Sequence, residues 1–401
     1  MSAADTIFEK RGVTLSLLQA VRDLALSIKP NPDYWSIGRL SAALVGNHEI
    51  LKPSNRWGKI NPEDTLTHAD QCSLIEVLRK HHSVNPHPKL GMTYAEVGKA
   101  NVFISFAYSS DFMELVNSIE CYMERNPHKH IASTFFWFDL FVNDQWTALT
   151  KSFEWWANTF RIAVEEIGET LLILTPWYDP DMLKRAWCLF EISCSKLVTI
   201  ALSRKQLEAF KVNYNENCLF LLSKLGNIDL QKATAFIPED RDRIFEVVRN
   251  KEGGFQSFNV NIINLLHEWI SDAARSLVAG IHDESMTFEE MSNLQKTSTL
   301  LKQQGDYEES IVMMERIAIQ CERLLIKSRN SGLELVRLQN FNNLGVCHRR
   351  NLALQKAEVY FEMALPAYEK AFGSEVTPVR VRNIKHIYTH PKSVKISLEY
   401  Q

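Results

Sequence analysis

The chain has 401 residues, of which 45% are hydrophobic and 23% charged, and its formal net charge is −3. This length favours two or three domains, and the small net charge argues against a nucleic-acid or anionic-membrane partner. The apolar runs are too short to span a bilayer, residues 1–9 lack a signal-peptide pattern, and the seven cysteines are scattered, so we expect a cytoplasmic protein with reduced thiols.

Residues 1–96 are predicted to form a helical N-terminal extension. Apolar residues recur at helical spacing over residues 13–28, which predicts an amphipathic helix. A second helix is expected over residues 69–81. The Pro- and Asn-containing stretch at 83–89 then predicts a boundary.

Residues 97–202 alternate between predicted strands and helices. Strands are expected at Asn101 to Phe106, Thr134 to Phe138, Leu171 to Thr175 and Leu197 to Leu202, with helices at 111–124, 153–167 and 183–196. Units of this length connect parallel strands through right-handed crossovers, which place helices on both faces of a sheet. The sequence therefore predicts an α/β domain with a parallel sheet, and we expect its strand at Asn101 to lie between those at Thr134 and Leu171.

Two aspartates are predicted to begin helices of this domain. Asp111 should cap the first helix together with Ser110, and Glu114 should bond back as the capping-box partner. Asp179 should cap the third helix, because Pro180 suits the first helical position.

The rest of the chain is predicted to be helical. Residues 203–285 should buttress the sheet, with a break at Gly253 and Gly254. Residues 286–401 contain an internal repeat, because the stretch that starts at Tyr307 aligns with the stretch that starts at Leu354, and 354 − 307 = 47 residues. This spacing predicts helical hairpins that stack into an α-solenoid, with a third, incomplete unit at 379–388.

Five residues are candidates for a ligand site at the carboxyl edge of the predicted sheet, where α/β folds bind ligands. Ser105 and Phe106 end the first strand, Asp139 ends the second, and Glu191 and Trp187 lie on the helix after the third. Four of the five have a structural alternative. Glu191 could be solvated, Trp187 could pack in the core, Ser105 could cap locally, and Asp139 could start an Asx turn.

Two groups of histidines raise the possibility of a metal site. They are His81, His82 and His87, and the pair His128 and His130. Because no cysteine or carboxylate stands at a familiar ligand spacing beside them, surface histidines are the favoured interpretation, and no metal is predicted.

Three motifs in residues 99–202 resemble those of a divergent Toll/interleukin-receptor (TIR) domain. They are Val102-Phe-Ile-Ser-Phe followed by Asp111, Phe135-Phe-Trp-Phe-Asp139, and Trp187-Cys-x-x-Glu191, which resembles the helix of plant TIR domains. The tail resembles kinesin-light-chain-like tetratricopeptide (TPR) repeats, including Lys370-Ala-Phe-Gly373 and Pro378.

The TIR resemblance implies a flavodoxin-like parallel sheet and, for many TIR domains, cleavage of NAD at the nicotinamide–ribose bond. Glu191 would then be the catalytic carboxylate, Ser105, Phe106, Asp139 and Trp187 would bind the ligand, and NAD would be a substrate, with no cofactor required. The resemblance also implies self-association of the TIR-like domain and a peptide or helix ligand for the repeats. The alternative is a non-catalytic adaptor, which the glycine-free loop at 139–152 favours.

Overall fold

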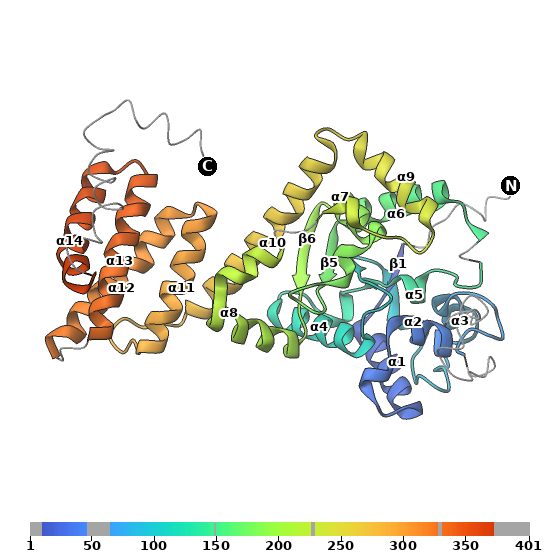
Figure 1. The fold of residues 1–401 in the computed structure, drawn as a ribbon. Helices are drawn as coiled ribbons and strands as arrows, with labels where there is room; N and C mark the ends of the chain where they lie inside the picture. The colour runs from blue at the N-terminus through green and yellow to red at the C-terminus, as the bar shows by residue number, and fades with distance from the viewer. Residues whose placement is uncertain (1–9, 46–64, 148–149, 226–228, 328–330, 373–401) are drawn as a thin grey trace. The chain divides into compact units, whose positions relative to one another are not determined.

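The computed structural model describes residues 10–45, 65–147, 150–225, 229–327 and 331–372 (Figure 1). The chain divides into two compact units, residues 1–216 with 220–264, and residues 265–401 with 217–219. The division falls inside the long helix α10 (Gly254–Val278). Within the described residues, no helix has both the length and the apolar composition that crossing a membrane requires.

In the residues that the structure describes, unit 1 is built on a six-stranded, mostly parallel sheet with the order β2-β1-β4-β3-β5-β6. β3 pairs in parallel with both β4 and β5, and β5 pairs in parallel with β6. The prediction that the strand near Asn101 lies between its two neighbours is thus confirmed. The strands are β1 (Arg11–Val13), β2 (Val97–Lys99), β3 (Val102–Ser105), β4 (Phe136–Trp137), β5 (Glu169–Ile173) and β6 (Leu197–Ala201).

The N-terminal residues contribute a strand that the sequence did not predict. β1 pairs antiparallel with β2 and with β4, so the predicted helical extension includes part of the sheet. Three residues are too few to show the alternation that identifies a strand. Gly12 permits the close pairing, because a Cβ at this position would lie 2.8 Å from the backbone of Phe136.

Helices cover both faces of the sheet, and alternate side chains along β4 show which helix lies on which face. Trp137 packs against Phe160 of α6, with ring centroids 5.6 Å apart. Its neighbour Phe136 points the other way and packs against Tyr122 of α4, at 6.4 Å. α7 packs beside α6, and α1 beside α4 (Figure 1). These helices are α1 (Leu15–Ile28), α4 (Phe112–Arg125), α6 (Phe153–Ile167) and α7 (Ala186–Cys194).

The remaining helices of unit 1 are shorter or follow the sheet. They are α2 (Ile37–Leu40), α3 (Leu74–His81), α5 (Asp139–Val142), α8 (Arg204–Leu225), α9 (Pro238–Arg249) and the first part of α10. The short 3₁₀ and π turns are Pro32–Tyr34, Ser41–Val45, Tyr94–Glu96, Ile131–Ser133, Asp181–Lys184 and Leu230–Lys232. Gly253 and Gly254 have positive φ angles of 73° and 50° and separate α9 from α10, which confirms the predicted break.

The predicted helix caps are partly corrected. Asp111 caps α4 as expected, accepting from the backbone N–H groups of Met113 and Glu114 at 2.6 and 3.1 Å. The Glu114 carboxylate does not return to the cap, because it accepts a hydrogen bond from the Ser203 hydroxyl.

Asp179 does not cap the third helix. A 3₁₀ turn intervenes, and α7 begins only at Ala186. The Asp179 carboxylate instead forms an ion pair with Lys184 at 2.8 Å.

In its described residues, unit 2 contains the last part of α10 and then the helices α11 to α14, each of these four packed against the next in the chain. α12 and α14 begin at Tyr307 and Leu354, so the structure has the predicted 47-residue period. Arg275 of α10 pairs with Glu309 of α12 at 2.8 Å, so the last part of α10 contacts these helices. The helices are α11 (Phe288–Gln304), α12 (Tyr307–Lys327), α13 (Ser331–Arg350) and α14 (Leu354–Phe372). The predicted third unit at 379–388 lies outside the described residues.

Candidate functional site

Glu191 reaches from α7 to the carboxyl end of β3. Its Oε2 accepts a hydrogen bond from the Ser105 hydroxyl at 2.5 Å. Ser105 is fully buried and Glu191 is only 8% exposed. Ser105 shares a face of β3 with Phe103, whose ring contacts Phe160 of α6, so the α6 and α7 side of the sheet holds this pair.

A second carboxylate, Asp139, follows β4 at the same edge of the sheet. Its Oδ2 accepts a hydrogen bond of 2.7 Å from the Tyr108 hydroxyl. Its Oδ1 accepts a hydrogen bond from the Asn143 amide. Tyr108 comes from the loop after β3 and is 41% exposed, so this part of the cluster reaches the surface.

Burial controls the charge of both carboxyl groups. Desolvation raises the pKa of Glu191 to about 8, the Ser105 hydrogen bond opposes this rise, and the Asp139 charge adds to it. Desolvation also raises the pKa of Asp139, against the hydrogen bonds from Tyr108 and Asn143. Glu191 therefore mostly holds its proton at neutral pH. The site offers one carboxyl group that can change protonation near physiological pH.

Phe106 and Cys188 complete the buried wall of the site. The Cys188 thiol donates to the Phe106 carbonyl oxygen at 3.1 Å, and burial raises the pKa of this thiol. The Phe106 ring packs against Tyr108 and Phe138, with centroids 5.6 and 4.9 Å apart. Cys188 is thus a protonated core thiol.

Trp187 lies in a different cluster. Its indole N–H donates to Asp240 of α9 at 3.2 Å. Its ring contacts three other aromatic rings, those of Phe153, Phe160 and Phe190. The structure therefore brings Ser105, Phe106, Asp139 and Glu191 together and places Trp187 where α7 meets α6 and α9.

The cluster lies at the carboxyl edge of the sheet, beside the end of β3. The parallel strands β4-β3-β5-β6 are, in chain order, second, first, third and fourth, which is the strand order of flavodoxin-like folds. In such sheets the crevice opens outside the carboxyl ends of the first and third strands, here β3 and β5. Tyr108 was missed in the sequence, because one aromatic residue in a loop carries no signal until its partner Asp139 is known.

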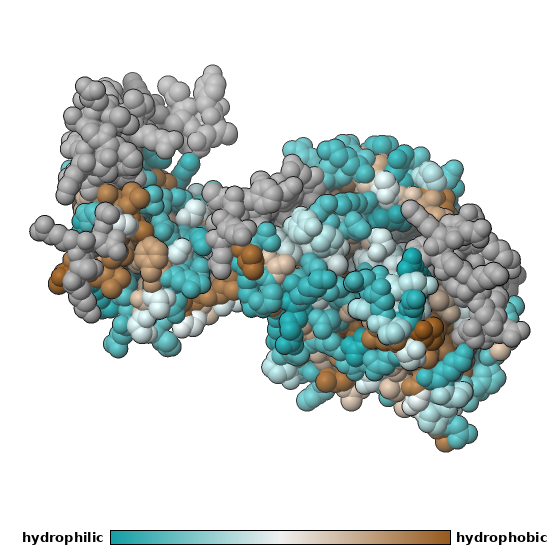
Figure 2. Space-filling view, turned by 60° about the horizontal axis from the view of Figure 1, so that its bottom comes forward, coloured by the Kyte–Doolittle hydropathy of each residue, from teal (hydrophilic) through white to brown (hydrophobic). Residues whose placement is uncertain are grey.

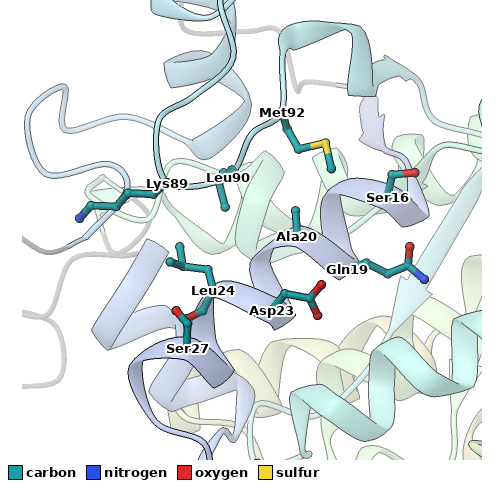
Figure 3. A pocket seen from close by; sticks show the side chains of 9 residues that line it. All are labelled: Ser16, Gln19, Ala20, Asp23, Leu24, Ser27, Lys89, Leu90 and Met92. Atoms are coloured by element: carbon teal, nitrogen blue, oxygen red, sulfur yellow. The ribbon is translucent and has the colours of Figure 1, made fainter.

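A separate hollow of about 620 Å³ lies elsewhere in unit 1 (Figure 3). One side of α1 and the segment at 89–92 form its walls, and no candidate site residue lines it. The lining residues are Ser16, Gln19, Ala20, Asp23, Leu24, Ser27, Lys89, Leu90 and Met92.

The histidines of the N-terminal region are engaged locally. His81 pairs with Asp70 at 2.8 Å, and the rings of His82 and His87 lie 4.7 Å apart. Across the described ranges, no group of three or more His, Cys, Asp or Glu side chains is arranged to hold a metal ion.

Comparisons with protein-family models, curated proteins and solved structures found no match to this chain. Function is therefore inferred from the geometry of the site and from short sequence motifs.

Proposed function

We propose that unit 1 is a TIR-like domain of a signalling protein that cleaves NAD at the nicotinamide–ribose bond, and that unit 2 is a TPR-like module for a peptide or helix partner. One observation carries the catalytic proposal. Glu191 is a buried carboxyl group at the carboxyl edge of the sheet, held by Ser105 beside a second carboxylate. Buried carboxylates of purely structural role usually have a cationic partner. A shifted pKa in such a place favours a functional role.

The chemistry that this site would perform follows from the charge that develops in the reaction. As the bond between ribose C1′ and the pyridinium nitrogen breaks, its electron pair moves to that nitrogen, and neutral nicotinamide leaves. The positive charge passes to the ribose, where ionised Glu191 stabilises it. Water then adds to C1′ and loses a proton to a carboxylate, giving ADP-ribose, or an adenine nitrogen adds and gives a cyclic product.

The proposal includes a specific dependence on pH. Glu191 must be ionised to stabilise the cation, and in the free protein its pKa is about 8. We therefore expect kcat/KM for NAD to rise with pH until about that value. A flat profile between neutral and alkaline pH would contradict the role of Glu191.

The test is release of nicotinamide from NAD by the full-length chain. Glu191→Gln keeps the size and polarity of the side chain but removes the charge, so turnover should fall by roughly 100-fold or more. Glu165→Gln, at an exposed residue of α6 that pairs with Arg161, is the matched control and should keep full turnover. Equal turnover in wild type and Glu191→Gln excludes this mechanism. Because self-association is expected to complete the site, specific activity should increase with protein concentration.

A second candidate function is that of an adaptor without catalysis. The observation that favours it is that the proposed catalytic residues have little contact with solvent, since Ser105 is fully buried and Glu191 is 8% exposed. An adaptor would release no nicotinamide at any protein concentration, and its partner binding would be the same in Glu191→Gln. The nicotinamide assay thus separates the two functions.

A further inference from the structure

In the part of the chain that the structure describes, β6 is the last strand of the sheet and pairs with β5 alone (Figure 1). Towards β5, the Leu197 N–H donates to the Gly168 carbonyl oxygen at 3.1 Å, which identifies the bonded side of the strand. Successive residues of a strand direct their backbone groups to opposite sides. The N–H and C=O groups of Val198 and Ile200 therefore point away from β5, where the described residues provide no strand to pair with them.

The two edges of the sheet differ in their protection against further pairing. Natural sheets protect their edges with short strands, lysine or proline. At one edge, β2 has only three residues and ends on the exposed Lys99. At the other, β6 has five residues, Leu-Val-Thr-Ile-Ala, with neither a charge nor a proline. Leu197 is 56% exposed and the next three residues are partly exposed, so β6 is an open edge.

The side chains of unit 1 do not indicate a broad apolar interface on the face that Figure 2 shows. Among the described residues on that face, hydrophilic side chains predominate and hydrophobic ones form small, separate areas. An edge strand needs no such interface, because its backbone groups supply the hydrogen bonds and its alternate side chains supply the contacts. Strand pairing is therefore the form of association that this unit favours.

We propose that two copies of the chain pair through their β6 strands, in antiparallel orientation and with Thr199 facing Thr199 of the second copy. In this register Val198 faces Ile200 of the second copy, and Ile200 faces Val198 of the second copy. Residues opposed in this way exchange two hydrogen bonds in an antiparallel pair. The pairing therefore satisfies the outward N–H and C=O groups of Val198 and Ile200 in both copies.

The strand is complementary to itself, and this property assigns a second copy as the partner. Val198 and Ile200 are equally distant from Thr199, so no outward group at these two positions is left over. The branched side chains of Val198 and Ile200 become neighbours on one face, and the two Thr199 side chains become neighbours on the other. No like charges meet within the paired residues, because 197–201 contain none. The contact is symmetric and β2 is protected, so association stops at a dimer.

This dimer gives a defined surface to the self-association that the TIR resemblance implies. It does not rest on the proposed NAD chemistry, because neither Ser105 nor Glu191 belongs to β6. Its tests use no NAD, so the two proposals can fail separately.

Sedimentation of the full-length chain tests for the dimer. Wild type should show monomer and dimer in an equilibrium that shifts with protein concentration. Ile200→Pro removes an outward N–H that the sheet does not use, so it should raise the dissociation constant of the dimer at least about tenfold. The matched control, Ile200→Val, keeps this N–H and should dimerise as wild type does. A melting temperature close to that of wild type would show that the proline variant is folded.

Cysteine cross-linking tests the register, and it decides the matter if Ile200→Pro does not fold. Thr199→Cys would place two thiols in a non-hydrogen-bonded pair with Cα atoms about 4.5 Å apart, within the range for a disulfide. Mild oxidation should convert most of this variant to a covalent dimer. Leu197→Cys is the control, because the two copies of position 197 would lie more than about 13 Å apart. Wild type oxidised in parallel gives the background from its seven native cysteines.

Three results would overturn the proposal. The first is a wild-type chain that remains monomeric at every concentration tested. The second is a dimer that persists in a folded Ile200→Pro variant, which would place the interface on another surface. The third is cross-linking of Leu197→Cys as efficient as that of Thr199→Cys, which would exclude the register centred on Thr199.

Discussion

The two edges of the sheet hold buried glutamates with opposite surroundings. Glu169, at the amino edge of the sheet, is 9% exposed, and Glu191, at the carboxyl edge, is 8% exposed. Glu169 accepts hydrogen bonds from Lys129 at 2.8 Å and from two hydroxyl groups, those of Tyr122 at 2.7 Å and Thr199 at 3.0 Å. Glu191 accepts one from the Ser105 hydroxyl and lies near the like charge of Asp139.

This difference shows that the partners of a buried carboxylate, and not its burial, decide what it does. The Lys129 ammonium and two hydroxyl groups replace the hydrogen bonds to water that the Glu169 carboxylate loses on burial. This carboxylate therefore has a structural role. The surroundings of Glu191 disfavour its charge, so ionisation costs stability but leaves a carboxylate able to act on a developing cation. The amino edge thus favours a structural role and the carboxyl edge a chemical one.

Glu191→Gln should give the largest change in stability, and the sign should depend on pH. The folded pKa of about 8 lies above the ordinary value of 4.5, so the folded protein binds more protons between these values. Its free energy of unfolding therefore falls as pH rises through this window and stays level above it. Glutamine removes this loss, and urea unfolding should show the variant more stable than wild type by about 5 kcal/mol near pH 9.

The same variant should show no gain below about pH 4.5, where wild-type Glu191 is protonated in both states. Glu165→Gln serves again as the control, since that residue is exposed. A variant less stable than wild type at alkaline pH would mean that an ionised Glu191 stabilises the fold, and the contrast with Glu169 would disappear.

Glu169→Gln should have the opposite effect. Removing the charge leaves the Lys129 ammonium without its partner, so the free energy of unfolding should decrease by about 3 kcal/mol at neutral pH. Urea unfolding of Glu169→Gln and Glu191→Gln under the same conditions measures the two changes in the free energy of unfolding. An increase in stability would show that the amino-edge network does not compensate the charge.

Tyr108→Phe should have a smaller effect, also dependent on pH. The Tyr108 hydrogen bond lowers the pKa of Asp139 against the effect of burial, so it stabilises the ionised form. Losing it should cost about 1 kcal/mol at neutral pH, and less as acid protonates Asp139 in the folded state. Urea unfolding at neutral and acidic pH measures this difference, and a cost that increases in acid would contradict the described direction of the hydrogen bond.

Trp187→Phe should give the smallest effect. It keeps an aromatic ring beside Phe153 and Phe160 but removes the hydrogen bond to Asp240, at a cost of about 1 kcal/mol or less. Since the indole lies away from Ser105 and Glu191, the KM for NAD should stay unchanged. An increase in KM together with normal stability would instead support the contact with ligand that the sequence motif implies.

Most of the α/β arrangement was predictable because its signals are local. The helix over 153–167 was predicted with the observed bounds, since Ser152 caps its start and Gly168, with φ of 89°, ends it. The βα units predicted parallel pairing, and the expected central place of β3 is confirmed. The strand β1 was not predictable, because three residues with a central glycine become a strand only when β2 and β4 are beside them.

The sequence by itself determined the four parallel strands and the helices between them, the 47-residue period and the choice of Ser105, Asp139 and Glu191 as candidates. These depend on spacing, capping and apolar patterns within short stretches of chain. Only the tertiary structure decided that Glu191 meets Ser105 across 86 positions, that Asp139 bonds Tyr108, and that the Trp187 indole turns towards Asp240. The raised pKa of Glu191 belongs to this second group, because desolvation arises only when distant segments close around the carboxyl group.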